Sequence, residues 1–280
     1  MIALRRLVRR SPWSTTWGIG IVILVLLLAV LGPAVCPYNP TEQHIRDRLQ
    51  GPDTTHLLGT DQYGRDVLSR TILGARPSLA IAVLSMLLSM LIGVPLGILA
   101  AYHGRWLDSL VLRFVDVMMS FPTLVLGAAI AAVLGAGFFK VVLAIGIAFI
   151  PRFIRLARAP VLIIRETAYV EAARAIGMST TRLLARHVLP NALGEVLVVA
   201  TLWMATAIRV EASLAFLGLG VQPPTPSWGS MIREGVNRLA TAPWMAIAPG
   251  VAVLLFVLGI NLIGDGMRDV FDPRIQSRKR

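Results

Sequence analysis

The chain has 280 residues, of which 56% are hydrophobic and only 15% are charged, with a mean hydropathy of +0.72. A soluble domain carries about 25% charged residues, so this composition excludes an ordinary soluble protein and indicates a polytopic membrane protein. The single cysteine, Cys36, excludes an internal disulfide framework and a C-x-x-C metal pair.

The first apolar run, residues 17–35, follows a basic N-terminal segment. This is also the pattern of a secretory signal peptide. However, no A-x-A cleavage site follows the run, and the next residues, GPAVCPYNP, are a poor context for cleavage. We therefore expect an uncleaved membrane anchor.

Six segments are apolar enough to cross a bilayer, which takes about 20 residues of helix. They are residues 17–35, 79–101, 114–134, 141–154, 193–216 and 244–264. With a cytoplasmic N-terminus, two thirds of the 27 lysines and arginines lie on the cytoplasmic side, as the positive-inside rule requires. Topology then explains the net charge of +12, and no nucleic-acid partner is needed. Both termini and the connection 155–192 are expected in the cytoplasm.

The spans contain devices for helix packing in lipid. Gly93 and Gly97 lie one helical turn apart and predict the close approach of another helix. Prolines at positions 95, 122, 151 and 249 lie in or near spans, where they kink helices and free carbonyl groups. Each kink has either a functional role or a role in packing alone.

The connection 155–192 contains a polar, helix-forming insert. Residues 166–176 favour a helix, which Gly177 is suited to end in a left-handed turn. Ser179 is a good N-cap for a second helix, which Pro190 is expected to end. Residues 170, 173 and 176 form a small apolar stripe that must face the membrane bundle or another protein. The alternative is a solvated loop that lies against lipid headgroups.

The spacing within this insert resembles the EAA loop of bacterial ABC importer permeases. The matching residues are Glu171, Ala172, Ala173, Gly177, Leu189 and Pro190. In that family the loop is a coupling helix that docks into a groove of a cytoplasmic ATPase subunit. Four further stretches, at 56–70, 114–126, 213–232 and 260–274, look like the C-type permease subunit of dipeptide, oligopeptide and nickel importers.

The resemblance implies an all-α integral membrane fold with six transmembrane helices, the type I ABC importer permease fold, with both termini cytoplasmic. It divides the chain into four parts. Residues 1–36 form the cytoplasmic N-terminus and first transmembrane helix, and residues 37–75 an extracytoplasmic loop. Residues 76–266 form the permease core, with the coupling insert at 166–190, and residues 267–280 a basic cytoplasmic tail.

Two extracytoplasmic stretches carry further candidate residues. Asp61, Arg65 and Asp66 can form an ion-paired cluster between glycine turns. The resemblance puts this cluster near the landing site of a solute-binding protein, but we favour a brace for the long loop. Trp228 follows three prolines and suits an interfacial anchor. Its loop is expected to line the entrance, to contact the binding protein or simply to be rigid.

Arg209 and Glu211 are the only charges well inside a span, and such residues indicate a pathway or cavity. Both belong to the outward third of the fifth span, where Arg209 could extend to the interface. Two residues apart on a helix, they should point in different directions. A role in the translocation pathway and a structural role remain open for each.

The chain lacks the P-loop pattern G-x-x-x-x-G-K-S/T, so ATP hydrolysis is not expected on it. The resemblance implies a non-catalytic subunit in the bacterial inner membrane that binds no cofactor, with ATP and Mg on partner ATPase subunits. The implied partners are a homologous second permease, two cytoplasmic ATPase subunits, an extracytoplasmic solute-binding protein and the lipid bilayer. Di- or oligopeptides are the expected substrates, before glutathione, nickel chelates or a sugar.

Other function classes fit less well. A secondary transporter predicts paired intramembrane charges and an inverted repeat of hydropathy. A channel predicts a filter-like loop, and an intramembrane enzyme predicts a constellation of His, Asp or Cys. None of these patterns is recognisable in the sequence.

Overall fold

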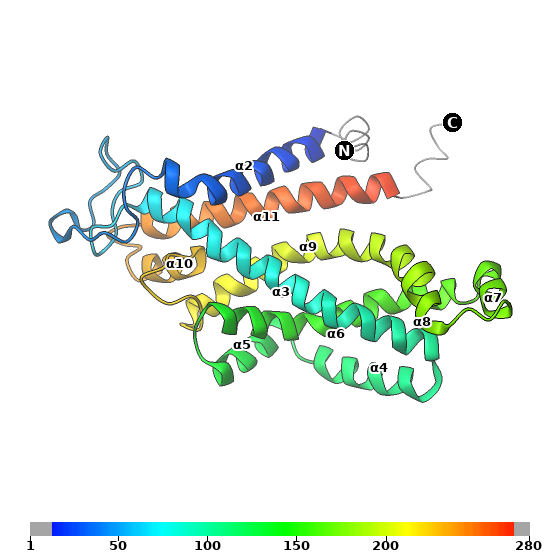
Figure 1. Ribbon diagram of the computed structural model, residues 1–280. Coiled ribbons are helices and arrows are strands. Elements are labelled where there is room, and N and C mark those ends of the chain that lie inside the picture. Colours follow the sequence, from blue (N-terminus) through cyan, green and yellow to red (C-terminus); the bar gives the residue numbers. More distant parts are fainter. Residues whose placement is uncertain (1–12, 272–280) are drawn as a thin grey trace.

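The computed structural model describes residues 13–271, and apart from one bridge between Thr60 and Asp66 every regular element in this range is a helix (Figure 1). The helices are α2 (Trp13–Val35), η1 (Ile45–Asp47), α3 (Val67–His103), α4 (Arg105–Met119), α5 (Thr123–Leu134), α6 (Phe138–Ile164), α7 (Ala168–Ala175), α8 (Thr180–Leu183), η2 (Leu184–Val188), α9 (Leu189–Phe216), α10 (Trp228–Val236) and α11 (Trp244–Phe271). The all-α fold is confirmed.

One helix covers each of five predicted spans, and two helices share the remaining one, residues 114–134. Within residues 13–271, four helices are long and apolar enough to cross a bilayer: Trp13–Val35, Val67–His103, Ala192–Phe216 and Trp244–Gly266. The predicted fourth span, 141–154, is the apolar first half of α6, whose second half carries arginines. Helix α3 begins at Val67, well before the predicted span and the predicted core boundary, because the Asp66 carboxylate caps it by accepting from the Ser69 amide at 2.8 Å.

The predicted third span, 114–134, is broken rather than continuous. Its halves, α4 and α5, meet at an angle of 89°, and Pro122 lies in the break. Proline lacks the amide hydrogen that continues a helix, and it drives the preceding residue toward extended conformations. The kink expected here is therefore nearly a right angle.

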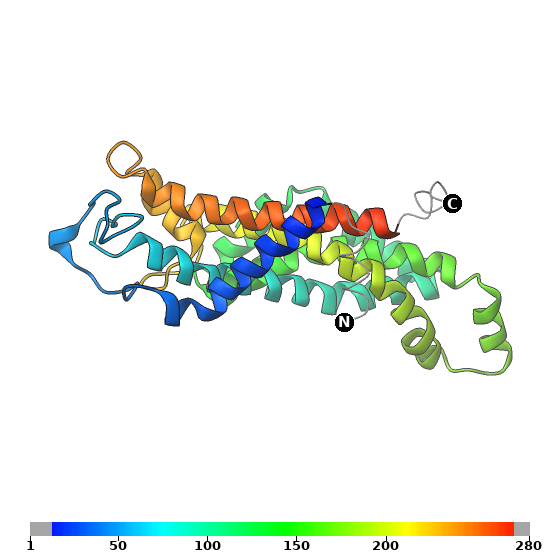
Figure 2. The ribbon, with the colours of Figure 1, turned by 90° about the horizontal axis from the view of Figure 1, so that it is seen from above.

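The two ends of the bundle differ as the predicted topology requires. The start of α2 and the end of α11 lie toward the end that carries α7 and α8 (Figures 1 and 2). The long loop after α2 and helix α10 lie at the opposite end (Figure 1). This arrangement agrees with cytoplasmic termini and a cytoplasmic insert.

Helices α3 and α6 form the central seam. A Cβ atom added to Gly93 would lie 2.6 Å from the Cβ of Phe153, and one added to Gly97 would lie 2.4 Å from the Ile154 carbonyl oxygen. Earlier in α3, the Ser89 hydroxyl donates to the Gly146 carbonyl of α6 at 2.7 Å. Small residues thus bring the two backbones into contact, and the close approach predicted at Gly93 and Gly97 is confirmed.

Helix α2 shows how the fold satisfies a backbone group that proline frees. Pro33 lies inside α2 and removes the partner of the Ala29 carbonyl four residues earlier. The Arg76 side chain from α3 donates to that carbonyl and to the Val30 carbonyl. In lipid an unsatisfied carbonyl costs several kcal/mol, so these contacts stabilise the helix around Pro33.

Candidate functional site

The insert is anchored to the cytoplasmic ends of two long helices. On α7, Val170 and Ala173 are buried in a cluster with Leu183, and Tyr102 of α3 and Ile164 of α6 pack against it. The predicted apolar stripe is therefore real at its first two positions. Ile176, just past the end of α7 at Ala175, is 79% exposed, and contact of this position with another protein stays a prediction.

Gly177 makes the predicted left-handed corner. Its φ is +78°, and the Met178 amide donates at 3.0 Å to the Ala173 carbonyl five residues back, which is the 6→1 hydrogen bond of a Schellman cap. Met178 also packs against the cluster around Ala173, which gives the hydrophobic contact of that motif. Ser179 is extended, as an N-cap should be, but its side chain makes no capping hydrogen bond.

The prediction that Pro190 ends the second helix is wrong. The chain is helical from Thr180 through η2, a π-helical turn, into α9, and Pro190 occupies the first turn of α9. Proline has no amide hydrogen to donate to the preceding turn, and the change from α-helix to the π-helical turn η2 lies just before it. The insert is consequently continuous with the fifth span.

The six EAA positions differ in exposure. Glu171, Ala172, Gly177 and Pro190 are exposed, whereas Ala173 is buried and Leu189 is half-buried. The two alanines thus separate: Ala173 faces the bundle and Ala172 faces outward. Docking of an ATPase subunit on this face stays a prediction.

Ion pairs fix α4 to α6 near the cytoplasmic side. Arg158 donates twice to the Asp108 carboxylate, at 2.8 and 2.7 Å, and Arg155 donates to Asp116 at 2.6 Å. Asp108 precedes the third predicted span, and the hydrogen bonds from Arg158 hold the pKa of its carboxyl below the ordinary value.

The two intramembrane charges lie on different sides of α9, as expected. Glu211 is fully buried, and its Oε2 accepts a hydrogen bond from the Ser78 hydroxyl of α3 at 3.3 Å. Its Oε1 has no partner among the described residues. Arg209 is exposed and donates only to Thr206, at 3.0 Å, within the described chain. A pathway role for either residue stays a prediction.

At the outer end, the predicted cluster is larger than the sequence indicated. The Arg65 Nε lies 2.6 Å from the Asp61 carboxylate, as predicted, and Arg70 lies 3.4 Å from the same carboxylate. Both arginines also contact Glu234 of α10, at 3.2 and 3.4 Å. Arg65 and Arg70 are less than 5% exposed, so the carboxylates neutralise charges removed from water.

The third predicted member, Asp66, is buried too but joins a different group. It caps α3, and its Oδ1 lies 3.0 Å from Nδ1 of His56. The long loop is thus fastened to α3 and α10, which accords with the brace that we favoured. Sequence reasoning missed His56, Arg70 and Glu234. Arg70 is four residues after Asp66 in the same motif, but no local signal indicates Glu234.

Trp228 is not the interfacial anchor that the sequence suggested. It is 2% exposed, its indole donates to the Thr71 carbonyl at 2.9 Å, and its ring lies beside Phe256. The reason is that α10 folds back against α3, α9 and α11 instead of lying at the lipid surface. The side chains of Asp61, Arg65, Asp66 and Trp228 are all buried, and a binding-protein contact by their loops stays a prediction.

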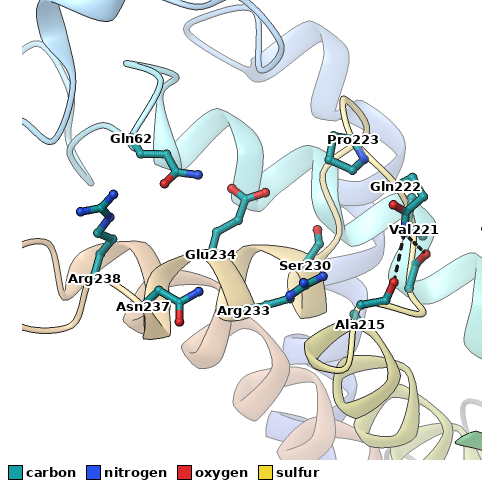
Figure 3. Close-up of a pocket in the computed structure, with 12 residues that line it drawn as sticks. Gln62, Ala215, Val221, Gln222, Pro223, Ser230, Arg233, Glu234, Asn237 and Arg238 are labelled. Atoms are coloured by element: carbon teal, nitrogen blue, oxygen red, sulfur yellow. Dashed lines mark hydrogen bonds between the residues drawn. The ribbon is translucent and has the colours of Figure 1, made fainter. Parts of the chain in front are cut away.

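A pocket of about 420 Å³ opens beside the ion-paired cluster of Asp61, Arg65, Arg70 and Glu234. It lies between α10 and the proline-rich loop, residues 217–227, which joins α9 to α10 (Figure 3). Gln62 and Glu234 point toward one another across it, and Gln222 holds the loop by donating to the Gly218 and Gly220 carbonyls at 3.3 and 3.1 Å (Figure 3). Gly218 has a φ of +84°, and a Cβ there would lie 2.9 Å from the Arg233 guanidinium. The loop therefore lines a polar hollow on the extracytoplasmic face.

Two family models match the chain. Residues 93–277 match the binding-protein-dependent transport system inner membrane component, and residues 3–52 match the N-terminal TM domain of oligopeptide transport permease C.

Curated relatives match over nearly the whole chain. The dipeptide transport system permease protein DppC of Alkalihalophilus pseudofirmus is 41% identical, over 95% of this chain and 91% of its own length. The di/tripeptide transport system permease protein DppC of Pseudomonas aeruginosa is 43% identical, over 93% and 88%. The glutathione transport system permease protein GsiD of Pectobacterium atrosepticum is 39% identical, over 96% and 93%.

Among solved structures, a chain of the MetNI methionine ABC transporter in an inward-facing conformation is similar in fold. The TM-score is 0.60 at 21% sequence identity, and the match covers 72% of this chain and 96% of that chain.

Proposed function

The chain belongs to the family of binding-protein-dependent transport system inner membrane components, and on that premise we propose that it forms half of the pathway of a short-peptide importer. It is a multi-pass inner-membrane permease subunit of an ABC importer, with the type I permease fold. Such a subunit performs no covalent chemistry. Its work is to admit the cargo and to change conformation.

The substrate class follows from what the relatives share. Their names specify dipeptides, di- and tripeptides, and glutathione, which are all short peptides with a free terminal carboxylate. The family as a whole does not fix the cargo. Glutathione is therefore the second candidate, with nickel chelates and sugars behind it.

The partners are part of the proposal. A homologous permease completes the pathway, a solute-binding protein delivers the peptide, and two cytoplasmic ATPase subunits bind ATP and Mg. The observation that carries the coupling role is the division of α7 into two faces. Val170 and Ala173 fasten the insert to α3 and α6, while Glu171 and Ala172 remain exposed for an ATPase subunit.

Because the insert is continuous with α9, a force applied to the insert can reach the fifth span. A push on α7 and α8 passes through η2 into the fifth span, which contains Arg209 and Glu211. Closure of the ATPase subunits would thereby move the residues proposed to border the pathway. Arg209 is exposed, so Arg209→Ala should alter uptake while ATPase docking remains unchanged.

The docking face is tested by adding bulk to it. Ala172→Trp places an indole on the exposed face of α7, and Leu57→Trp adds the same group at an exposed position of the outer loop. We expect loss of ATPase co-purification in mild detergent for Ala172→Trp and none for Leu57→Trp. Equal recovery of the ATPase subunits with both variants would show that the exposed face of α7 is not the docking site.

The cargo is tested with the complete transporter in proteoliposomes. ATP-driven uptake of a labelled dipeptide, delivered by the cognate binding protein, is the expected result. Uptake of a nickel chelate or sugar without any peptide uptake would overturn the peptide assignment and leave the permease role intact.

A further inference from the structure

Three arginines of α6 face the bent α4–α5 pair, and only two of them have acidic partners among the residues that the structure describes. Arg158 and Arg155 pair with Asp108 and Asp116, whereas Arg152 donates to the hydroxyl of Thr123 at 2.6 Å. Within residues 13–271, no ion pair joins Arg152 to a carboxylate. The innermost arginine of the row is thus the one without a counter-ion.

Arg152 is also the most deeply placed of the three in the membrane. It is 14 residues from the start of α6 at Phe138, or about 21 Å at 1.5 Å per residue, and the hydrocarbon core is about 30 Å thick. Arg152 therefore lies in the cytoplasmic third of the predicted fourth span, and a cationic side chain that faces a cavity within a span indicates a path for a ligand.

The cavity is present. A pocket of about 300 Å³ lies at the break between α4 and α5 and reaches Arg152. Apolar and polar groups share its walls: Met118, Met119, Phe121, Pro122, Leu126 and Ala148 lie beside Ser120, Thr123 and Arg152. The right-angle bend at Pro122 makes this space, because a continuous third span would carry these residues past α6 without forming a hollow.

The Arg152 guanidinium is held in place and still has N–H groups available for a ligand. Its carbon lies 5.1 Å from the ring centroid of Phe149 and 6.0 Å from that of Trp203, and these rings stabilise a cation. One N–H group is used by Thr123, and a guanidinium has five. The planar fork that remains matches a carboxylate, which Arg binds in bidentate fashion.

We propose that Arg152 and the methionine-lined pocket form a carboxylate site for short peptides inside the membrane pathway. This inference rests on the function proposed above. The terminal carboxylate binds the Arg152 guanidinium, and a peptide side chain contacts Met118, Met119 and Phe121. Methionine is flexible and polarisable, so such a wall accepts side chains of different shape, as a transporter of varied peptides requires.

The test measures peptide affinity in the assembled transporter without its binding protein. Dialanine and dialanine amide are titrated against the purified complex in nanodiscs, for wild type, Arg152→Gln, Arg152→Lys and Arg155→Gln. Arg155 is the matched control, because its pair with Asp116 is exposed and lies outside the pocket. Co-purification of the second permease is recorded for every variant.

We expect Arg152→Gln to weaken dialanine binding at least tenfold and to leave dialanine amide unchanged. Arg152→Lys should lose less dialanine affinity, because lysine keeps the positive charge but cannot bind a carboxylate in bidentate fashion. Arg155→Gln should bind dialanine as tightly as wild type. Unchanged dialanine affinity in Arg152→Gln would overturn the site, even where wild-type proteoliposomes import the dipeptide. Loss of the second permease from Arg152→Gln with full peptide affinity in the remaining complex would instead assign Arg152 to an acid of that subunit. Failure of the wild type to import any peptide would refute the proposed function itself.

Discussion

Replacing Gly177 with valine tests whether the corner of the insert transmits force. The φ of Gly177 is +78°, and a Cβ at this position would have no neighbour within 4 Å. The substitution therefore meets no steric obstacle, and its whole cost is that of the left-handed backbone. That cost is about 1–2 kcal/mol for a residue with a Cβ.

A change of this size alters the ratio between the native corner and its alternatives by about 5- to 30-fold. The corner orients α7 on α8, so its loss should uncouple the ATPase subunits from α9 without preventing membrane insertion. Asparagine tolerates the left-handed region, and Gly177→Asn is the matched control.

The assay is dipeptide uptake per ATP hydrolysed in proteoliposomes, with the amount of inserted protein measured in parallel. We expect a several-fold lower ratio for Gly177→Val and a ratio near wild type for Gly177→Asn. A wild-type ratio for the valine variant would show that the corner is dispensable. An equal loss with asparagine would show that glycine is needed here for a reason other than its φ.

Three further substitutions probe the scaffold. Asp61→Asn removes a carboxylate shared by two buried arginines, and thermal unfolding in detergent should show a stability lower by about 3–5 kcal/mol. Gly97→Val would bring a Cβ within 2.4 Å of a carbonyl oxygen of α6, so its melting temperature should fall far below that of Gly20→Val, where a Cβ has open space. Because Arg158 lowers the pKa of Asp108 from its ordinary 3.8, the ion pair stabilises the fold above that pH and the contribution is lost as the pH falls through the lowered pKa. The stability advantage of wild type over Asp108→Asn should accordingly shrink as the pH is lowered below 3.8, and an advantage that grows on acidification would contradict this account.

The sequence by itself determined the features that depend on local chemistry. Apolar length gave the positions of the spans, the placement of arginines predicted their orientation, and glycine indicated the left-handed corner at Gly177 and the close seam at Gly93 and Gly97. Hydropathy, helix periodicity and backbone freedom act over a few residues, so they can be recognised without knowing the fold.

Tertiary structure decided the contacts that join distant segments. Glu234 meets Arg65 across 169 residues of sequence, and Trp228 is buried because α10 folds against three other helices. The same proline chemistry has opposite outcomes at two positions: Pro122 lies where a span breaks at 89°, whereas the helix continues from η2 into α9 through Pro190. A proline removes one amide hydrogen in either case, and only the packing around it determines whether the helix bends, begins or ends there.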